Sequence, residues 1–281
     1  MPPGANIAPM LTRTRARRAG LALLLAVALA APAAPAYAAH QRRPAPAPAP
    51  SPSPSPLQLI PDLLSALLPS LFPPPSGGGA VAPSLQERVV ASTVRVSGPA
   101  CGRIQVGSGF SPRADLAVTA AHVVAGVSRP EVLRPDGRRL AATVVAFDPN
   151  QDLAVLRVNG LSQAPLPLGS PVVGTDAAVF GHPNGRATVE VSPARVTAAG
   201  VVRAPNIYGQ LVSRDIVRLA TSLDPGDSGG AVVDTGGNVV GVAYGVSLQR
   251  TDVAFAVNAR EVQSVLNRPL SSPVSTGPCI G

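Results

Sequence analysis

From residue 85 onward the chain is a succession of short apolar runs separated by turns that contain Gly, Pro, Asn or Asp. Short strands spaced by turn residues at this density are typical of a β-sandwich or a β-barrel. The sequence therefore predicts an all-β fold for this part of the chain. The expected strands cover residues 89–96, 140–147, 153–158, 177–180, 189–191, 216–221, 231–233, 239–244 and 253–257.

Two local signals complete this prediction. The run Asp234-Thr235-Gly236-Gly237-Asn238 is a hairpin turn between two of the expected strands. Near the C-terminal end, Asn258 can cap a helix, and Glu261, three residues later, can complete a capping box. We therefore expect one helix in this domain, at its C-terminal end.

Three polar motifs interrupt the apolar pattern in a fixed order. Thr119-Ala120-Ala121-His122 comes first, Asp152 opens an apolar strand 30 residues after His122, and Gly226-Asp227-Ser228-Gly229-Gly230 places Ser228 a further 76 residues on. A serine hydroxyl is a weak nucleophile near neutral pH, so an imidazole must take its proton and return it to the leaving amine. A buried carboxylate then fixes the imidazole tautomer. The motifs predict a triad of Ser228, His122 and Asp152.

The glycines around Ser228 predict an oxyanion hole. A tetrahedral intermediate carries a negative oxygen that needs preorganised donors, and small residues let backbone N–H groups converge on it. We expect the donors to be the backbone N–H groups of Gly226 and Ser228. Losing one such donor typically costs about 2.7–4 kcal/mol of transition-state stabilisation.

Other residues compete for two of these roles. His40 lies in the N-terminal region and His182 in a turn-like segment, so His122 is the histidine in an apolar context. The alternative for His122 is a hydrogen-bonded core histidine without a catalytic role. Asp148 is a rival acid, but it precedes a Pro-Asn pair, as a turn-initiating residue does. Asp152 opens the strand that would bury it, and we favour Asp152.

Through these motifs the chain resembles the trypsin-like, or chymotrypsin-fold, serine peptidases. The segment Asp148-Pro149-Asn150-Gln151-Asp152-Leu153-Ala154-Val155-Leu156 is similar to bacterial HtrA-type proteases. Cys101, just before Gly107-Ser108-Gly109-Phe110, and Cys279 at the chain end resemble the actinobacterial acid-resistance periplasmic proteases. The resemblance covers residues 85–281. We expect no PDZ domain and no multi-span membrane domain in this chain.

The resemblance implies two six-stranded antiparallel β-barrels of the chymotrypsin type, over residues 85–168 and 169–281. The second range includes the short C-terminal helix and a tail. His122 and Asp152 would come from the first barrel and Ser228 from the second, with the triad in the cleft between them. Asp227, beside the nucleophile, would be structural.

The resemblance also suggests a specificity pocket. Six residues before the nucleophile, Ser222 would form its floor, and Ala243-Tyr244-Gly245 would form its wall strand. A preference for Arg or Lys before the scissile bond needs a carboxylate at the floor. Because Ser222 is neutral, we expect a small or apolar residue there instead.

The two cysteines, Cys101 and Cys279, are expected to pair, since two cysteines in an exported chain usually form one disulfide. For so long a loop the chain-entropy model gives roughly 5 kcal/mol of stabilisation. Two free thiols are the alternative. A disulfide here would tie the tail beside the first barrel and could hold the cleft formed.

The first 84 residues are predicted to be a leader and a linker. An arginine-rich start, an apolar run over 19–31 and Ala36-Tyr37-Ala38 indicate a secretory signal peptide over 1–38. An uncleaved anchor is the alternative. Residues 39–84 form a Pro/Ala/Ser-rich linker, which includes a short apolar segment with helical spacing at 57–72. Residues 19–72 are thus a candidate for contact with a membrane or the cell envelope.

The charge of the chain gives no sign of nucleic-acid binding. The formal net charge is +8, but without the four leader arginines 19 basic and 15 acidic residues remain, a net charge of +4. Such an excess, with no basic tract interleaved with aromatic residues, favours solubility rather than a nucleic-acid footprint. We expect a monomer with protein or peptide substrates, no nucleic acid, no cofactor and no metal.

Together these features predict an exported bacterial serine endopeptidase, secreted or extracytoplasmic, that works through an acyl-enzyme. The alternative is a non-catalytic exported binding protein on the same fold. An α/β-hydrolase esterase is disfavoured because its triad follows the chain order Ser, Asp, His.

Overall fold

The computed structural model describes residues 81–280. The expected signal peptide, the linker up to residue 80 and the apolar segment at 57–72 lie outside these residues. Within 81–280, no helix is long and apolar enough to cross a membrane.

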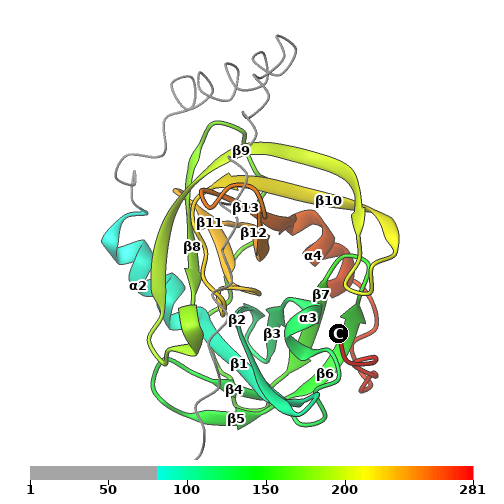
Figure 1. The fold of residues 1–281 in the computed structure, drawn as a ribbon. Coiled ribbons are helices and arrows are strands. Elements are labelled where there is room, and N and C mark those ends of the chain that lie inside the picture. The colour runs from blue at the N-terminus through cyan, green and yellow to red at the C-terminus, as the bar shows by residue number, and fades with distance from the viewer. Residues whose placement is uncertain (1–80, 281) are drawn as a thin grey trace, which may run out of the picture. The chain divides into compact units, whose positions relative to one another are not determined.

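Two antiparallel β-sheets form the framework of the described residues (Figure 1). The first has seven strands in the order β5-β4-β1-β2-β3-β7-β6. Its strands are β1 Thr93–Ala100, β2 Arg103–Arg113, β3 Leu116–Thr119, β4 Glu131–Leu133, β5 Arg139–Ala141, β6 Thr143–Asp148 and β7 Leu153–Arg157. The edge strands β5 and β6 are joined by Ala142 alone, so this sheet must curl until its two edges meet.

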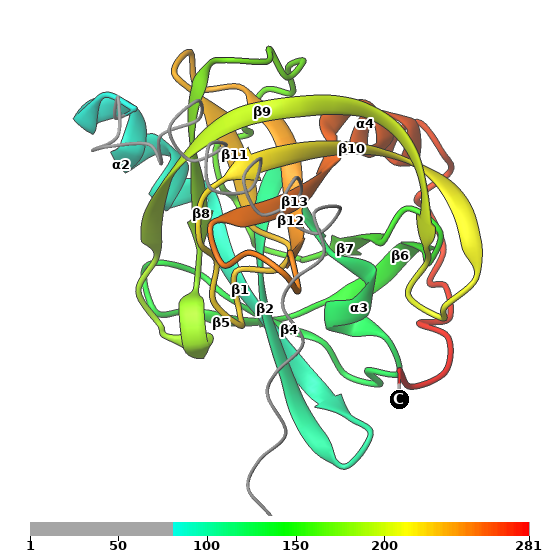
Figure 2. The ribbon, with the colours of Figure 1, turned by 45° about the horizontal axis from the view of Figure 1, so that its top comes forward.

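The second sheet is a closed six-stranded barrel in the order β10-β13-β12-β11-β8-β9. Its strands are β8 Asp176–Gly181, β9 Glu190–Pro205, β10 Leu211–Ala220, β11 Ala231–Asp234, β12 Val239–Val246 and β13 Val253–Asn258. The strands β9 and β10 form a long curved hairpin, which Figure 2 shows arching over the other strands. At the tip of this hairpin, Asn206 is hydrogen-bonded to Asn150, which lies two residues before Asp152.

The prediction of an all-β fold built from two barrel-like sheets with a short C-terminal helix is confirmed. The barrel of β8 to β13 has the expected six strands, whereas the curled first sheet has seven. The expected run at 140–147 divides at Ala142 into β5 and β6, which lie at opposite edges of the sheet. The expected hairpin at residues 234–238 joins β11 to β12. The boundary drawn at residue 168 falls in the connection between β7 and β8.

The expected strand at 89–96 is wrong in its first half. Residues 89–92 are the last turn of helix α2, Pro83–Ser92, and β1 begins at Thr93. Pro83 suits the first turn of a helix. Leu85 and Val89 lie four residues apart, so both face the core and are buried there. This helical spacing prevails over the β-propensity of the valines.

Two further helices accompany α2 in the described residues: α3, Ala121–Val124, and α4, Ala259–Leu266. The C-terminal helix that the sequence indicated is α4, whereas α2 and α3 were not predicted. The side chain of Asn258 accepts a hydrogen bond from the backbone of Arg260, so the predicted N-cap of α4 is confirmed. Among residues 81–280 no hydrogen bond from Asn258 reaches the Glu261 side chain, so the capping box is not formed.

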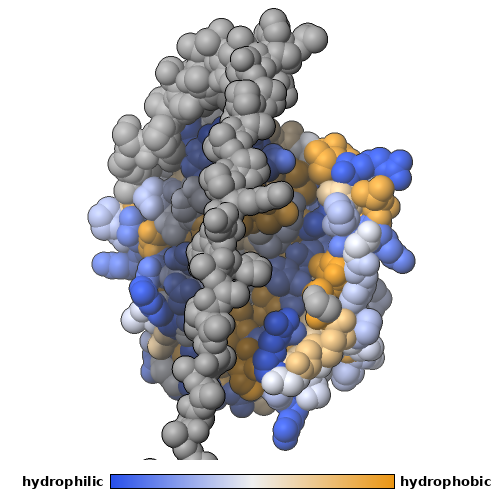
Figure 3. Space-filling view, viewed as in Figure 1, coloured by the Kyte–Doolittle hydropathy of each residue, from blue (hydrophilic) through white to orange (hydrophobic). Residues whose placement is uncertain are grey.

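Buried apolar side chains connect the two sheets. One hydrophobic cluster includes Phe110 and Val118 from the first sheet together with Phe180 and Val242 from the second. Leu85 of α2 belongs to the same cluster. The surface is mixed: Figure 3 shows hydrophobic and hydrophilic residues interspersed over one face. This shared core holds the two sheets against each other. His122, Asp152 and Ser228 line one cleft.

Candidate active site

His122 and Asp152 lie next to each other. His122 belongs to α3, directly after β3, and Asp152 directly precedes β7, and the pairing of β3 with β7 brings them together. Nδ1 of His122 lies 2.9 Å from Oδ2 and 3.1 Å from Oδ1 of Asp152. The backbone N–H of His122 also donates to Oδ1, at 2.9 Å. Asp152 is buried, whereas the His122 side chain is partly exposed.

The backbone of Asp152 is in the left-handed region, with φ of 58°. The preceding turn is held by Asp148, whose Oδ1 accepts the backbone N–H groups of Asn150 and Gln151 at 3.1 and 3.0 Å. Its Oδ2 accepts from Arg268 at 2.8 Å. Asp148, the rival acid, thus serves the turn that presents Asp152.

The pKa of His122 is raised above its ordinary value. Burial of the ring is the largest influence and lowers the pKa, as does the positive charge of Arg214. The charge of Asp152 and its hydrogen bond to the ring together outweigh them. The ring nitrogen that faces Asp152 is Nδ1, which leaves Nε2 as the atom that could exchange a proton with a substrate or nucleophile.

Ser228 lies in the loop between β10 and β11 and lines the same cleft as His122. Its carbonyl accepts from the backbone N–H of Ser108 at 2.8 Å, and the next residue, Gly229, donates to the Ala243 carbonyl at 2.7 Å. These two bonds tie the serine loop to strands of both sheets. Gly226 has φ of 104°, which L side chains rarely adopt. Within the described part of the chain, the N–H groups of Gly226 and Ser228 donate to no protein atom.

A second set of contacts holds the loop in front of Ser228. Oγ of Ser108, on β2, donates to the Gly226 carbonyl at 2.6 Å and accepts the backbone N–H of His182 at 2.8 Å. The turn at Pro183–Gly185 also contributes, because the Asn184 N–H donates to the Pro225 carbonyl at 2.5 Å. With the Pro225 carbonyl held there, the N–H of Gly226, on the opposite side of that trans peptide, points away from the turn.

Asp227 is buried beneath this loop. Its Oδ2 accepts the backbone N–H of Asp224 at 2.9 Å, and burial raises the pKa of its carboxyl group. These contacts are consistent with the structural role that the resemblance implied.

Of the four residues expected to form a specificity pocket, Tyr244 alone is among the described residues that line the cleft beside Ser228. Tyr244 lines the cleft, whereas Ser222 is exposed and its Oγ donates to the Thr251 carbonyl at 3.0 Å. Ala243 is buried and accepts the N–H of Gly229, and Gly245 pairs with Phe255 in β13. Ser222, Ala243 and Gly245 are not among the described residues that line the cleft beside Ser228.

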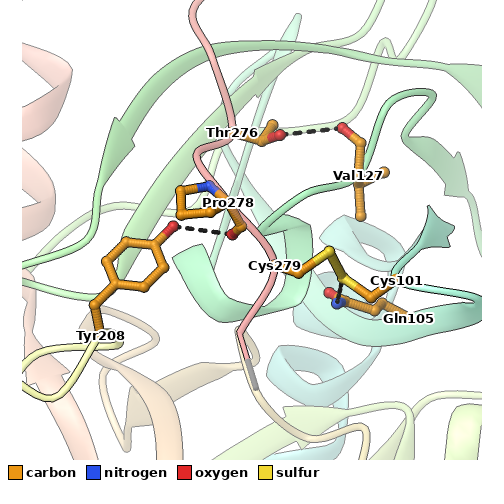
Figure 4. Close-up of a disulfide and its surroundings, with 7 residues drawn as sticks. All are labelled: Cys101, Gln105, Val127, Tyr208, Thr276, Pro278 and Cys279. Atoms are coloured by element: carbon orange, nitrogen blue, oxygen red, sulfur yellow. Dashed lines mark hydrogen bonds between the residues drawn. A yellow bond between two sulfur atoms is a disulfide. The ribbon is translucent and has the colours of Figure 1, made fainter.

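A disulfide joins Cys101 to Cys279 (Figure 4). The C-terminal tail that carries Cys279 is also hydrogen-bonded to its surroundings: Thr276 Oγ1 donates to the Val127 carbonyl, and the Tyr208 hydroxyl donates to the Pro278 carbonyl, each at 3.2 Å. Ile280, next to the disulfide, reaches the rim of the cleft. The tail is therefore part of the wall around the candidate site.

Sequence reasoning missed three residues of this site. Arg214 of β10 contacts the Asp152 region from the opposite sheet, Ser108 supports the loop at Gly226, and Ile280 lines the cleft. Ser108 belongs to the run Gly107-Ser108-Gly109-Phe110, but neither this run nor the neighbours of Arg214 and Ile280 in the sequence indicate a contact with the site. Their roles arise from contacts between distant segments, so a single sequence gave no signal for them.

A histidine–carboxylate pair and a glycine-flanked serine that face one cleft form the arrangement of a serine hydrolase site. A family model described as a trypsin-like peptidase domain matches residues 107–242. The crystal structure of the active form of Rv3671c protease from M. tuberculosis has a TM-score of 0.68 at 33% identity, and the match covers 72% of this chain and 91% of that chain. The chain belongs to the family of trypsin-like serine proteases.

Curated relatives agree with this assignment. Serine protease Rv3671c of Mycobacterium tuberculosis is 35% identical over 192 residues, which are 66% of this chain and 48% of the relative. Serine protease Do-like HtrA of Lactococcus lactis subsp. cremoris is 26% identical over 182 residues, which are 58% of this chain and 44% of the relative. The chain thus spans about half the length of the curated relatives it matches.

Proposed function

We propose that this protein is an exported serine endopeptidase that hydrolyses peptide bonds through Ser228, His122 and Asp152. The observation that carries the proposal is the His122–Asp152 pair, with Nδ1 held at 2.9 Å, in the same cleft as Ser228. Family membership supports it.

In the proposed reaction, Ser228 Oγ attacks the carbonyl carbon of the substrate while Nε2 of His122 takes the hydroxyl proton. The imidazolium that forms lies against the Asp152 carboxylate, which stabilises its charge. Nε2 then gives the proton to the leaving amine, and the C–N bond breaks to leave an acyl-enzyme on Ser228. A water molecule, deprotonated by His122, hydrolyses the acyl ester and restores the serine.

The N–H groups of Gly226 and Ser228 serve as oxyanion donors in this proposal. Among residues 81–280 neither has a protein acceptor, and the contacts of Ser108 and Asn184 hold the loop that presents them. Donors fixed in advance need no reorganisation when charge develops on the substrate oxygen.

The proposal includes a preference for a small or apolar residue before the scissile bond. Asp152 is the sole carboxylate among the described residues that line the cleft, and His122 already occupies it. The cleft instead contains Arg103 and Arg214 together with apolar residues such as Ile104, Ile207 and Ile280. Profiling with a peptide library checks this, and strict cleavage after Arg or Lys would contradict it.

Export and location at the cell envelope belong to the same proposal. They are supported by the signal-peptide pattern over residues 1–38. The Cys101–Cys279 disulfide agrees with an oxidising compartment.

Labelling of the purified, oxidised protein with a fluorophosphonate probe tests the proposed activity. We expect covalent labelling that disappears in Ser228→Ala and falls sharply in His122→Ala. Ser271→Ala, which removes an exposed serine of the C-terminal segment, is the matched control and keeps full labelling. A folded wild-type protein that takes up no label would support the non-catalytic binding protein instead.

A further inference from the structure

Arg214 is a buried arginine beside the proposed triad. It lies on β10, and its side chain is 5% exposed. Its Nη2 lies 4.0 Å from Oδ2 of Asp152, whose side chain is 4% exposed. The guanidinium therefore places a full positive charge next to the proposed catalytic carboxylate, in a site largely closed to water.

Three contacts fix the plane of the guanidinium. Nη2 donates to the carbonyl of Gln151 at 3.2 Å, and Nη1 donates to the carbonyl of Pro205 at 3.4 Å. The group also stacks over the ring of Tyr244, with Cζ 4.2 Å from the ring centroid. A planar cation with several donors can make all these contacts at once, which a lysine ammonium cannot.

The strand that carries Arg214 is itself anchored to the turn before Asp152. At the tip of the β9–β10 hairpin, the side-chain amide of Asn206 donates to Oδ1 of Asn150 at 2.8 Å, and the N–H of Ile207 donates to the Pro149 carbonyl at 3.3 Å. Gln151 Nε2 donates to the Ser213 carbonyl at 3.1 Å. Hydrogen bonds thus hold the β9–β10 hairpin of the second sheet against the turn before Asp152 in the first sheet.

The charges around Asp152 explain what such an arginine could do. Both hydrogen-bonded donors of the carboxylate, the backbone N–H and the ring Nδ1, belong to His122, which is uncharged in the resting form of a triad. A buried carboxylate without a cation is costly, and a nearby guanidinium offsets that cost.

We propose that Arg214 is a positioning residue of the proposed protease, which holds the Asp152 carboxylate oriented toward Nδ1 of His122 and holds Tyr244 as a wall of the cleft. This inference rests on the proposed function. It adds a fourth polar residue, supplied by the β9–β10 hairpin, to the machinery around the triad.

A pH profile separates this role from a merely structural one. The groups that act on His122 are Asp152 from the turn before β7 and Arg214 from β10. Tyr244 of β12 and Arg103 of β2 line the same cleft. The positive charge of Arg214 lowers the pKa of His122. Removing that charge should therefore raise the pKa of His122.

The test compares kcat/KM against pH for the wild type, Arg214→Gln and Arg214→Lys. In Arg214→Gln, which keeps donor groups but loses the charge, we expect the acidic limb of the profile to move to higher pH and kcat to fall about 10²-fold, the effect of a misplaced catalytic group. Arg214→Lys keeps the charge, so its acidic limb stays near that of the wild type while kcat falls. Arg218→Gln, an exposed arginine on the same strand, is the matched control and leaves the profile unchanged.

A measurement without turnover separates failure of this inference from failure of the proposed function. In Ser228→Ala protein, NMR titration of the His122 ring gives its pKa directly, and we expect Arg214→Gln to raise it and Arg214→Lys to leave it near the parent value. An unchanged titration in Arg214→Gln, or an equal rise in Arg214→Lys, overturns the role of Arg214. Absence of fluorophosphonate labelling in the wild type overturns the protease proposal alone.

Discussion

Asp152 is bound twice by His122, once through the backbone N–H and once through the ring. The N–H donates to Oδ1 at 2.9 Å, and ring Nδ1 lies 2.9 Å from Oδ2. Because both donors come from one residue, the carboxylate fixes the position of the α3 turn together with the orientation of the imidazole.

Replacing the carboxylate should therefore damage catalysis more than folding. In Asp152→Asn the side-chain amide can donate to Nδ1, which favours the tautomer with a proton on Nε2 and removes the base that Ser228 needs. We expect kcat to fall about 10⁴-fold, as such changes do in other triads. Steady-state kinetics with a peptide substrate measure this. Asp148→Asn, the matched control at the turn, should keep most of the activity, and an equal loss in both variants would contradict the assignment of the acid.

Ser108 should matter for the proposed oxyanion hole. Its hydroxyl joins the His182 N–H to the Gly226 carbonyl, so Ser108→Ala leaves a buried N–H and a half-buried carbonyl without this partner. Such a loss costs about 1–3 kcal/mol, and we expect part of it to appear as a lower kcat through displacement of the Gly226 N–H. Ser111→Ala removes an equally buried serine of the same strand, which bonds Gln163 instead. If kcat falls equally in both variants, Ser108 has no specific part in the site.

The sequence predicted the fold class and most strands because alternation and turn residues are local signals. The strands at 231–233, 239–244 and 253–257 agree closely with β11, β12 and β13. The β1–β2 hairpin was largely missed, since Ser97, Gly98 and Pro99 in β1 and Gly107 and Gly109 in β2 weaken the strand pattern. These residues pair across a ladder that local propensity does not show.

In the candidate site, too, residues with a local signal were predicted and residues placed by long-range contacts were not. His122, Asp152 and Ser228 could be named because each stands in a motif, and the structure brings His122 against Asp152 in the cleft that Ser228 lines. Spacing alone placed Ser222 at a pocket floor, which stays a prediction; in the structure Ser222 is exposed and donates to the Thr251 carbonyl. Arg214 and the tail residue Ile280 enter the cleft from other parts of the chain, through pairings that no motif encodes.

The disulfide should stabilise the protein through the tail. Cys101 and Cys279 are 178 residues apart, and closing so long a loop is worth roughly 5 kcal/mol in the chain-entropy model. We expect a reductant to lower the melting temperature or the activity of the wild type, because the tail lines the cleft through Ile280. The double variant Cys101→Ser, Cys279→Ser should start lower and not respond. An equal response to the reductant in both proteins would show that the disulfide is not the cause.

His182 should make the folded protein sensitive to acid. Its ring is fully buried, Nδ1 lies 2.9 Å from the Arg186 carbonyl, and Nε2 has no partner among the described residues. Burial above all, and also the charge of Arg95, lowers the pKa of His182. Above the unfolded pKa of about 6.5 the ring is neutral in both states. As the pH falls below that value, the unfolded chain takes up a proton that the folded state does not, so the free energy of unfolding decreases until the lowered folded pKa is reached.

The variant His182→Asn isolates this effect. An asparagine amide can donate to the Arg186 carbonyl but does not titrate, so the free energy of unfolding should depend less on pH below about 6.5 than in the wild type. His122 acts in the opposite direction, because its raised pKa favours the folded state at low pH, but it is present in both proteins and cancels in the comparison. Denaturant unfolding on both sides of that pH measures the difference. If the free energy of unfolding depends on pH equally in the two proteins, the pKa of His182 is not lowered in the folded state and the prediction is wrong.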